Sequence, residues 1–316
     1  MKQYEHESRQ WLEEQLKDIR KWEKEQKSLW FWEKLGRLPF ALLDRMLPKG
    51  LQEKIGQALN EIGQFVQTGG DYLVAEKSVL AKLAAEAGDE SAGVGSDASM
   101  EDGPEEAPET DGTREPATGR SFGGKTDKQP ALPEVRRLPL AIMDKVAEEL
   151  GASRAKLAAA QGATTGFGGL FTLAIDIPAM LGLSLKVLQE TALCYGYDPK
   201  DKSERVFAVK CLQFVSSDVV GKKAVLEELA DYENEERDRQ VVSQLQGWRE
   251  VMESYRDSFG WKKLFQLVPV AGMLVGAYLN KGSVEEVAEA GRMLYRKRRI
   301  MERLRAMEQG SLPPGL

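Results

Sequence analysis

Apolar side chains recur at helical spacing through most of this chain. Near the N-terminus, Leu12, Leu16 and Ile19 follow one another at i, i+4 and i+7, with Trp11 and Trp22 at the edges of the stripe and charged residues elsewhere. This pattern predicts an amphipathic helix. Tryptophan beside lysine also suits a membrane interface, but an apolar stripe on a helix more often faces a core, and we favour that interpretation.

Further helical stripes follow, and alternating runs of β-branched residues are scarce throughout. Segments 134–149 and 152–161 are predicted as short helices joined at Gly151, and an amphipathic helix is expected from about Ser283 to the C-terminus. The sequence therefore predicts an all-α fold. We expect a multi-helix bundle with a central glycine-rich apolar helix and a disordered acidic insert.

Residues 88–130 differ in composition from the rest of the chain. They hold eleven Asp and Glu against four Lys and Arg, a local charge of −7, so that the remainder carries +1 of the net charge of −6. They are rich in Gly, Ser and Pro and nearly lack large apolar groups, so burial cannot offset their ordering entropy. We expect a disordered insert that divides one helical domain into residues 1–87 and 131–309, with a flexible tail at 310–316.

The stretch from Gly162 to Tyr197 is the centre of the predicted fold. It opens with four glycines and continues into the longest apolar segment, where residues 170–195 predict a long helix that contains Pro178. A second glycine-rich apolar patch covers residues 267–280. Glycines four residues apart let helices approach closely, so we expect the two patches to meet. The predicted close-packing glycines are Gly162, Gly166, Gly168, Gly169, Gly272 and Gly276.

An integral membrane protein that inserts these glycine-rich segments is one alternative. Residues 166–185 carry a single full charge and reach the minimum length of a membrane span. However, Asp176 at the centre of a span is costly, and Pro178 and the glycines add little favourable transfer energy. The patch at 267–280 is too short to span as a helix. A hairpin buried in protein and one that dips into a single leaflet both stay open.

Four polar residues fall within one narrow sector of the long apolar helix, namely Thr172, Asp176, Lys186 and Glu190. A buried carboxylate must meet a cation, N–H groups or water, or else become protonated. We favour a structural ion pair, and the alternative is a polar site in a hydrolase or another enzyme that uses the carboxylates and the lysine. No catalytic residue is assigned, because His6 is the sole histidine of the chain and a histidine-based triad is excluded.

The C-terminal helix is strongly basic. Between residues 292 and 305, seven cations stand against one acid, Glu302. Basic clusters attract anionic lipid or nucleic acid, and the chain offers no nucleic-acid motif, so we expect an anionic membrane surface or a membrane protein as the partner. The candidate lipid contacts are Arg292, Arg296, Lys297, Arg298, Arg299, Arg303 and Arg305.

The sequence indicates no cofactor and no metal. Cys194 and Cys211 fit neither a zinc knuckle nor a redox CxxC motif, so we expect free buried thiols in a reducing cytoplasm. The N-terminus lacks the apolar core of a signal peptide. The expected location is cytoplasmic and peripheral on the inner face of the cell membrane, and the sequence names no small-molecule ligand.

Two separated blocks carry a resemblance to a known family. The block GATTGFGGLFTLAIDIPAMLGLSLKVLQETALCYGYDPKDKSERVFAVKCL and the later PVAGMLVGAYLNKGSVEEVAEAGRMLYRKR resemble the EcsC family of bacterial proteins, and the earlier LPKGLQEKI also fits. The resemblance covers nearly all of the chain except residues 88–130. It implies a link to a membrane ABC transporter, beside whose gene the family's namesake lies, and it brings no catalytic residues. We therefore expect a non-enzymatic, membrane-peripheral accessory or interaction protein.

Overall fold

The computed structural model describes residues 7–26, 74–93, 131–166, 173–217, 219–231 and 272–310, and every regular element within these ranges is a helix. The prediction of an all-α bundle is therefore confirmed. In chain order the helices are α1 (Arg9–Gln26), α5 (Glu76–Gly93), α6 (Leu132–Val135), α7 (Leu140–Gly166), α8 (Leu173–Cys194), α9 (Lys202–Ser216), α10 (Val219–Asp231) and α13 (Gly272–Glu308).

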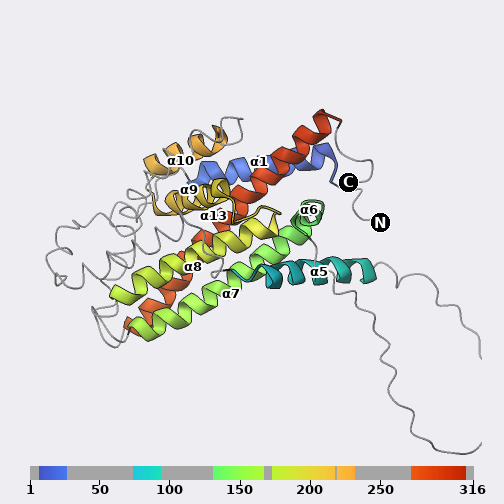
Figure 1. The fold of residues 1–316 in the computed structure, drawn as a ribbon. Helices are drawn as coiled ribbons and strands as arrows, with labels where there is room; N and C mark the ends of the chain where they lie inside the picture. The colour runs from blue at the N-terminus through green and yellow to red at the C-terminus, as the bar shows by residue number, and fades with distance from the viewer. Residues whose placement is uncertain are drawn as a thin grey trace, which may run out of the picture.

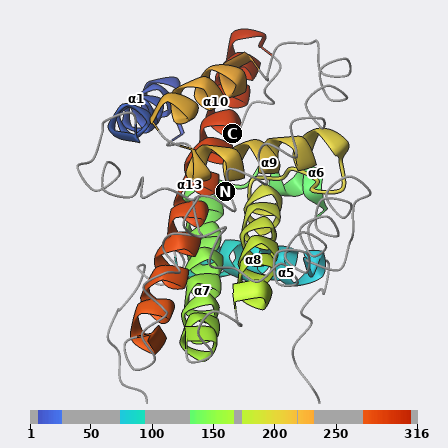
Figure 2. The same cartoon turned by 90° about the vertical axis from the view of Figure 1, so that its left-hand side faces the viewer.

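Three long helices, α7, α8 and α13, form the centre of the bundle (Figures 1 and 2). α7 and α13 run antiparallel, because Gly162 near the end of α7 packs on Gly276 near the start of α13, while Gly151 packs on Ala288. α8 lies against both, and Leu188 contacts the backbone of α13 at Gly291. The C-terminal end of α7 and the N-terminal ends of α8 and α13 therefore share one end of the bundle.

Two helices are longer than the sequence predicts. α7 continues through Gly151, where we expected a joint between two helices, and α13 begins at Gly272 instead of near Ser283. At Gly151 the reason is close packing: an added Cβ would lie 2.8 Å from Cβ of Ala288. The glycine thus serves a helix contact and not a break, because real Cβ atoms almost never approach so closely.

The stripe on α1 faces the core, as predicted. Leu12, Leu16, Ile19 and Trp22 are all buried, and the Trp22 indole N–H donates a hydrogen bond of 2.9 Å to Glu289 on α13. The Trp22 ring also packs against Phe214 of α9, with 5.6 Å between ring centroids. These tryptophan contacts explain how α1 lies across the C-terminal half of α13 in Figure 1.

Other predictions concern segments that lie wholly or largely outside the described residues. The acidic insert is one of them, although α5 ends at Gly93 and so extends into its first residues. The tail predicted at 310–316 is another, because only its first residue, Gly310, is described. Among the helices that the structure describes, none is long and apolar enough to cross a bilayer, which goes against the integral-membrane alternative.

Candidate functional site

Asp176 lies near the start of α8 at the centre of a hydrogen-bond cluster. Its side chain is fully buried, and its Oδ1 accepts hydrogen bonds of 3.1 Å from the side-chain amides of Gln161 on α7 and Asn280 on α13. The hydroxyl of Thr165 lies 3.0 Å from the same oxygen and 3.0 Å from the carbonyl oxygen of Gln161. The carboxylate therefore connects all three central helices.

Glu190, near the other end of α8, forms a separate cluster. Its two carboxylate oxygens accept hydrogen bonds of 2.9 and 2.7 Å from the guanidinium of Arg154 on α7, and the Nζ of Lys186 lies 3.8 Å away. Glu190 is buried, while Arg154 and Lys186 keep about a quarter of their side chains exposed. Glu190 is thus held in an ion pair whose main partner, Arg154, lies on α7 and outside the predicted stripe.

The predicted polar stripe therefore does not form one site. A helix rises about 1.5 Å per residue, so Asp176 lies about 15 Å from Lys186 and about 21 Å from Glu190 along the axis of α8. Catalytic groups must reach one substrate within about 3 Å, and this spacing is far too large for that. Thr172 falls outside the described residues. In the described part of the chain, no group of three or more His, Cys, Asp or Glu side chains could hold a metal ion.

The glycine patches meet at Gly162 and Gly276. A Cβ added to Gly162 would lie 2.5 Å from the carbonyl carbon of Gly276 and 2.9 Å from Cγ of Asn280, so only glycine permits this approach. Gly166 is buried at the end of α7, and Gly272 begins α13. Gly168 and Gly169 lie outside the described residues. The contact places Asn280 within reach of Asp176.

Three of the seven basic residues that we predicted as lipid contacts on α13 are buried instead. Arg298, Arg299 and Arg303 are only 3%, 4% and 7% exposed, so they do not reach a membrane surface. The prediction overlooked that a guanidinium is buried readily when a carboxylate or carbonyl accepts its fixed fork of donors. Arg298 binds both oxygens of Glu204 on α9, each at 2.7 Å.

Most of the seven basic residues between 292 and 305 form ion pairs with carboxylates. The five ion pairs are Arg296 with Asp144, Lys297 with Glu23, Arg298 with Glu204, Arg299 with Glu302, and Arg303 with Glu7. Arg292 is half-buried and Arg305 is exposed. The cluster is thus largely neutralised by carboxylates from α1, α7, α9, α13 and the segment before α1.

Two arginines, Arg136 before α7 and Arg299 of α13, bind the turn that ends α8. Gly196 adopts a φ of +75°, which favours glycine, and its carbonyl accepts a hydrogen bond of 2.9 Å from Arg136. The carbonyl of Tyr195 accepts one of 3.0 Å from Arg299. Carbonyl groups at a helix C-terminus carry partial negative charge, so cations stabilise this end of α8.

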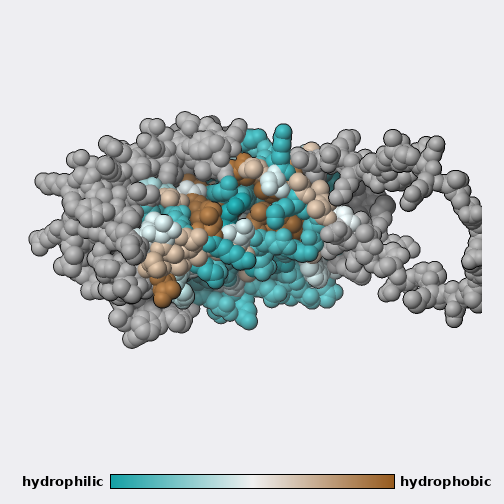
Figure 3. All heavy atoms as spheres, turned by 90° about the horizontal axis from the view of Figure 1, so that it is seen from below, coloured by the Kyte–Doolittle hydropathy of each residue, from teal (hydrophilic) through white to brown (hydrophobic). Residues whose placement is uncertain are grey.

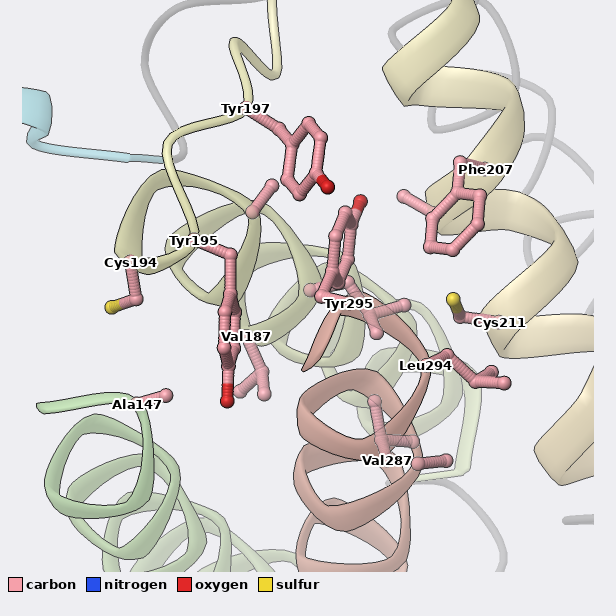
Figure 4. Close-up of a cluster of buried hydrophobic side chains, with 14 of the residues drawn as sticks. Ala147, Val187, Cys194, Tyr195, Tyr197, Phe207, Cys211, Val287, Leu294 and Tyr295 are labelled. Carbon is pink, nitrogen blue, oxygen red and sulfur yellow. The ribbon is translucent and has the colours of Figure 1, made fainter. Parts of the chain in front are cut away.

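An aromatic cluster, whose rings are drawn in Figure 4, lies against the guanidinium groups of Arg298 and Arg299. The Tyr295 ring packs between Tyr197 and Phe207, with centroid distances of 5.6 and 4.6 Å, and the guanidinium of Arg298 lies 4.1 Å from the centroid of the Tyr197 ring. Cys211 lies beside this cluster in the same view. Complete burial raises the pKa of the Cys194 and Cys211 thiols well above the usual value, so neither is a reactive thiolate.

The structure also exposes apolar residues that the sequence did not single out. Leu274 and Tyr278 of α13 are 78% and 77% exposed, Met273 is 43% exposed, and Leu157 of α7 is 51% exposed. Leu274 and Tyr278 are four residues apart and so lie on one face of the helix. No sequence signal marked that face, because nearly every residue from 267 to 280 is apolar or small.

Comparison with known proteins places the chain among bacterial relatives. A family model described as the EcsC protein family matches residues 13–300. The chain is 50% identical over 300 residues to the Uncharacterized protein YdbA of Bacillus subtilis (strain 168), covering 94% of this chain and 96% of that protein. It is 32% identical over 165 residues to Protein EcsC of the same organism, covering 52% of this chain and 67% of that protein. No solved structure matches it.

Proposed function

Because the chain belongs to the EcsC protein family, we propose that it is a non-enzymatic accessory or interaction protein that binds peripherally at the surface of a membrane. The proposed location is the inner face of the cell membrane, where a membrane transporter system is a candidate neighbour. Two free, buried cysteines accord with a reducing compartment.

One observation carries the proposal, namely the pair of bulky apolar side chains on the outer face of α13. Leu274 and Tyr278 expose more than three quarters of their surface, although a folded protein gains free energy by burying such groups. Neighbouring exposed apolar residues mark interaction surfaces, and a tyrosine ring with its polar hydroxyl suits the boundary between lipid and water. This pair supports an attachment to lipid.

Flotation tests the proposal. The full chain is mixed with vesicles that contain both phosphatidylcholine and phosphatidylglycerol and is then centrifuged in a density gradient. We expect the protein to rise with the vesicles, and washing cell membranes with carbonate to release it, as for a peripheral protein. A protein that stays in the dense fraction with every vesicle composition and salt concentration would refute the proposal.

A further inference from the structure

We propose that this protein docks on the membrane end-on, through the end of the bundle where α7 ends and α8 and α13 begin, and that it does so by inserting uncharged side chains into a neutral bilayer. This inference rests on the proposed function, and it names the surface and the lipid chemistry. It replaces the sequence-based expectation that the basic helix binds anionic lipid.

The first argument is the lack of charge at this end. We define the uncharged end as residues 157–166 of α7, 173–185 of α8 and 272–280 of α13. Within these described residues, Asp176 is the only charged side chain by type, and it is fully buried. In a chain with 30% charged residues, these three neighbouring helix ends hold no exposed charge, and the exposed Lys156 of α7 and Lys281 of α13 mark their edge.

The second argument is the apolar exposure at the same end. Leu274 and Tyr278, in the first two turns of α13, are more than three quarters exposed, and Met273 is 43% exposed. Seen from below, tan and brown residues lie at the left of the described surface, the side where α7 ends and α13 begins, and others lie near its middle and right (Figure 3). Burying a leucine side chain fully contributes about 2 kcal/mol, so a few such groups suffice for reversible attachment.

The third argument is that most cations of the basic cluster are paired with carboxylates and three of them are buried, although Arg305 is exposed. Arg298, Arg299 and Arg303 are buried against carboxylates and carbonyl groups, at the opposite half of α13. The first lysine after the uncharged end, Lys281, lies 3.1 Å from Glu285 and is neutralised by it. The described surface near Leu274 therefore lacks the net positive charge that attraction to anionic headgroups requires.

The sequence around the uncharged end favours lipid over a protein partner. The chain between α7 and α8 reads FGGLFT, and the residues directly before α13 read LVPVA, so both connections that lead into this end are apolar in composition. Protein interfaces surround an apolar centre with a polar rim that carries hydrogen bonds and charge. An uncharged surface with exposed apolar groups, a tyrosine and the hydroxyl of Thr164 matches the bilayer interface instead.

The experiment measures the partition coefficient of the full chain on vesicles of pure phosphatidylcholine and of phosphatidylcholine with phosphatidylglycerol, each at about 0.1 and about 0.5 M NaCl. We expect binding to the neutral vesicles that changes less than about twofold with salt or with anionic lipid. Leu274→Glu, which places a charge at the inserted position, lowers the partition coefficient by about tenfold or more. The control Gln309→Glu makes the same charge change at an exposed position beyond the other end of α13 and leaves binding unchanged.

The outcomes separate this inference from the proposed function. Binding that requires anionic vesicles and disappears at high salt overturns end-on apolar insertion but leaves a peripheral membrane protein. Equal binding by Leu274→Glu and the unchanged protein likewise overturns the docking surface alone. Failure to bind any vesicle overturns both proposals, and a Leu274-dependent dimer in sedimentation would then identify the surface as an interface between copies of the chain. Thermal unfolding of each variant verifies that a loss of binding is not a loss of fold.

Discussion

At the scale of single residues, the structure assigns buried polar groups to structural roles. Asp176 is held by donors from α7 and α13, and Glu190 is held by Arg154. Such groups are costly when unpaired and contribute modestly when paired, so their removal affects stability strongly. They specify how the three central helices align, because each pair forms in only one register of the helices.

Asp176→Ala provides the test at this scale. The substitution removes the acceptor for the amides of the half-buried Gln161 and the fully buried Asn280, so we expect the free energy of unfolding to fall by about 3 kcal/mol. Urea denaturation followed by circular dichroism measures the change. The matched control is Thr164→Ala, whose exposed hydroxyl contacts only its own helix at the carbonyl of Ala160, with an expected change within about 0.5 kcal/mol. Equal stabilities of the two variants would contradict the structural role of Asp176.

The arginines show why sequence reasoning identified residues but not their environment. Arg298 lies four residues after the buried Leu294, on the face of α13 that points into the core, so its position predicts burial. Arginine as a residue type, however, predicts exposure. Its partner Glu204 is 94 residues away in sequence, and the partner of Arg303, Glu7, is 296 residues away. A local pattern contains no information about such distant partners, so the cluster looked like a basic surface.

At the scale of elements, glycine contacts decide how closely helices pack. Gly162 and Gly151 of α7 allow contact with α13, and Gly291 of α13 allows contact with Leu188 of α8. The four-residue glycine spacing predicted that the two apolar patches meet, and the packing of Gly162 on Gly276 brings them together. It did not predict that α7 and α13 continue as long helices, because glycine disfavours a helix interior by propensity and close tertiary packing overrides that preference.

Two glycine substitutions in neighbouring helices should change stability in opposite directions. In Gly162→Ala the new Cβ would overlap the backbone at Gly276, so α7 and α13 must separate, and we expect a loss of about 2 kcal/mol or more in the free energy of unfolding. In Gly182→Ala the new Cβ of α8 meets nothing within 4 Å, and the gain in helix propensity should stabilise the protein by about 0.5 to 1 kcal/mol. Thermal denaturation of both variants gives the comparison, and a stabilised Gly162→Ala protein would show that the two helices do not need this approach.

At the scale of the whole molecule, α13 joins two ends of different chemistry. Its C-terminal half gathers carboxylates from α1, α7 and α9 around basic side chains, while its N-terminal half packs by glycine contacts and exposes Leu274 and Tyr278. At the C-terminal half of α13, ion pairs within the protein satisfy the basic side chains. The N-terminal half of α13 keeps exposed apolar groups that a membrane can cover. We therefore propose that the protein attaches to the membrane through this end.

The buried thiols lead to a prediction for the stability of the whole molecule at alkaline pH. Burial raises the pKa of Cys194 and Cys211 in the folded state, whereas an unfolded thiol has a pKa of about 8.5. Below about pH 8.5 both states keep the proton and the full stability is present. Above it only the unfolded thiols ionise, so the free energy of unfolding should fall by about 1.4 kcal/mol per pH unit for each thiol.

Urea denaturation at about pH 7.5, 9 and 10 measures this fall. The control replaces both cysteines by alanine, which lowers stability at every pH but should remove most of the decline up to about pH 10, where Tyr195 and Tyr197 begin to contribute. Burial raises the pKa of these tyrosines as well, so they act in the same direction at higher pH. If the free energy of unfolding stayed constant between about pH 7.5 and 10, the thiols would ionise equally in the folded and unfolded states. Water would then have to reach both thiols in the folded protein, which contradicts their burial between α8 and α9.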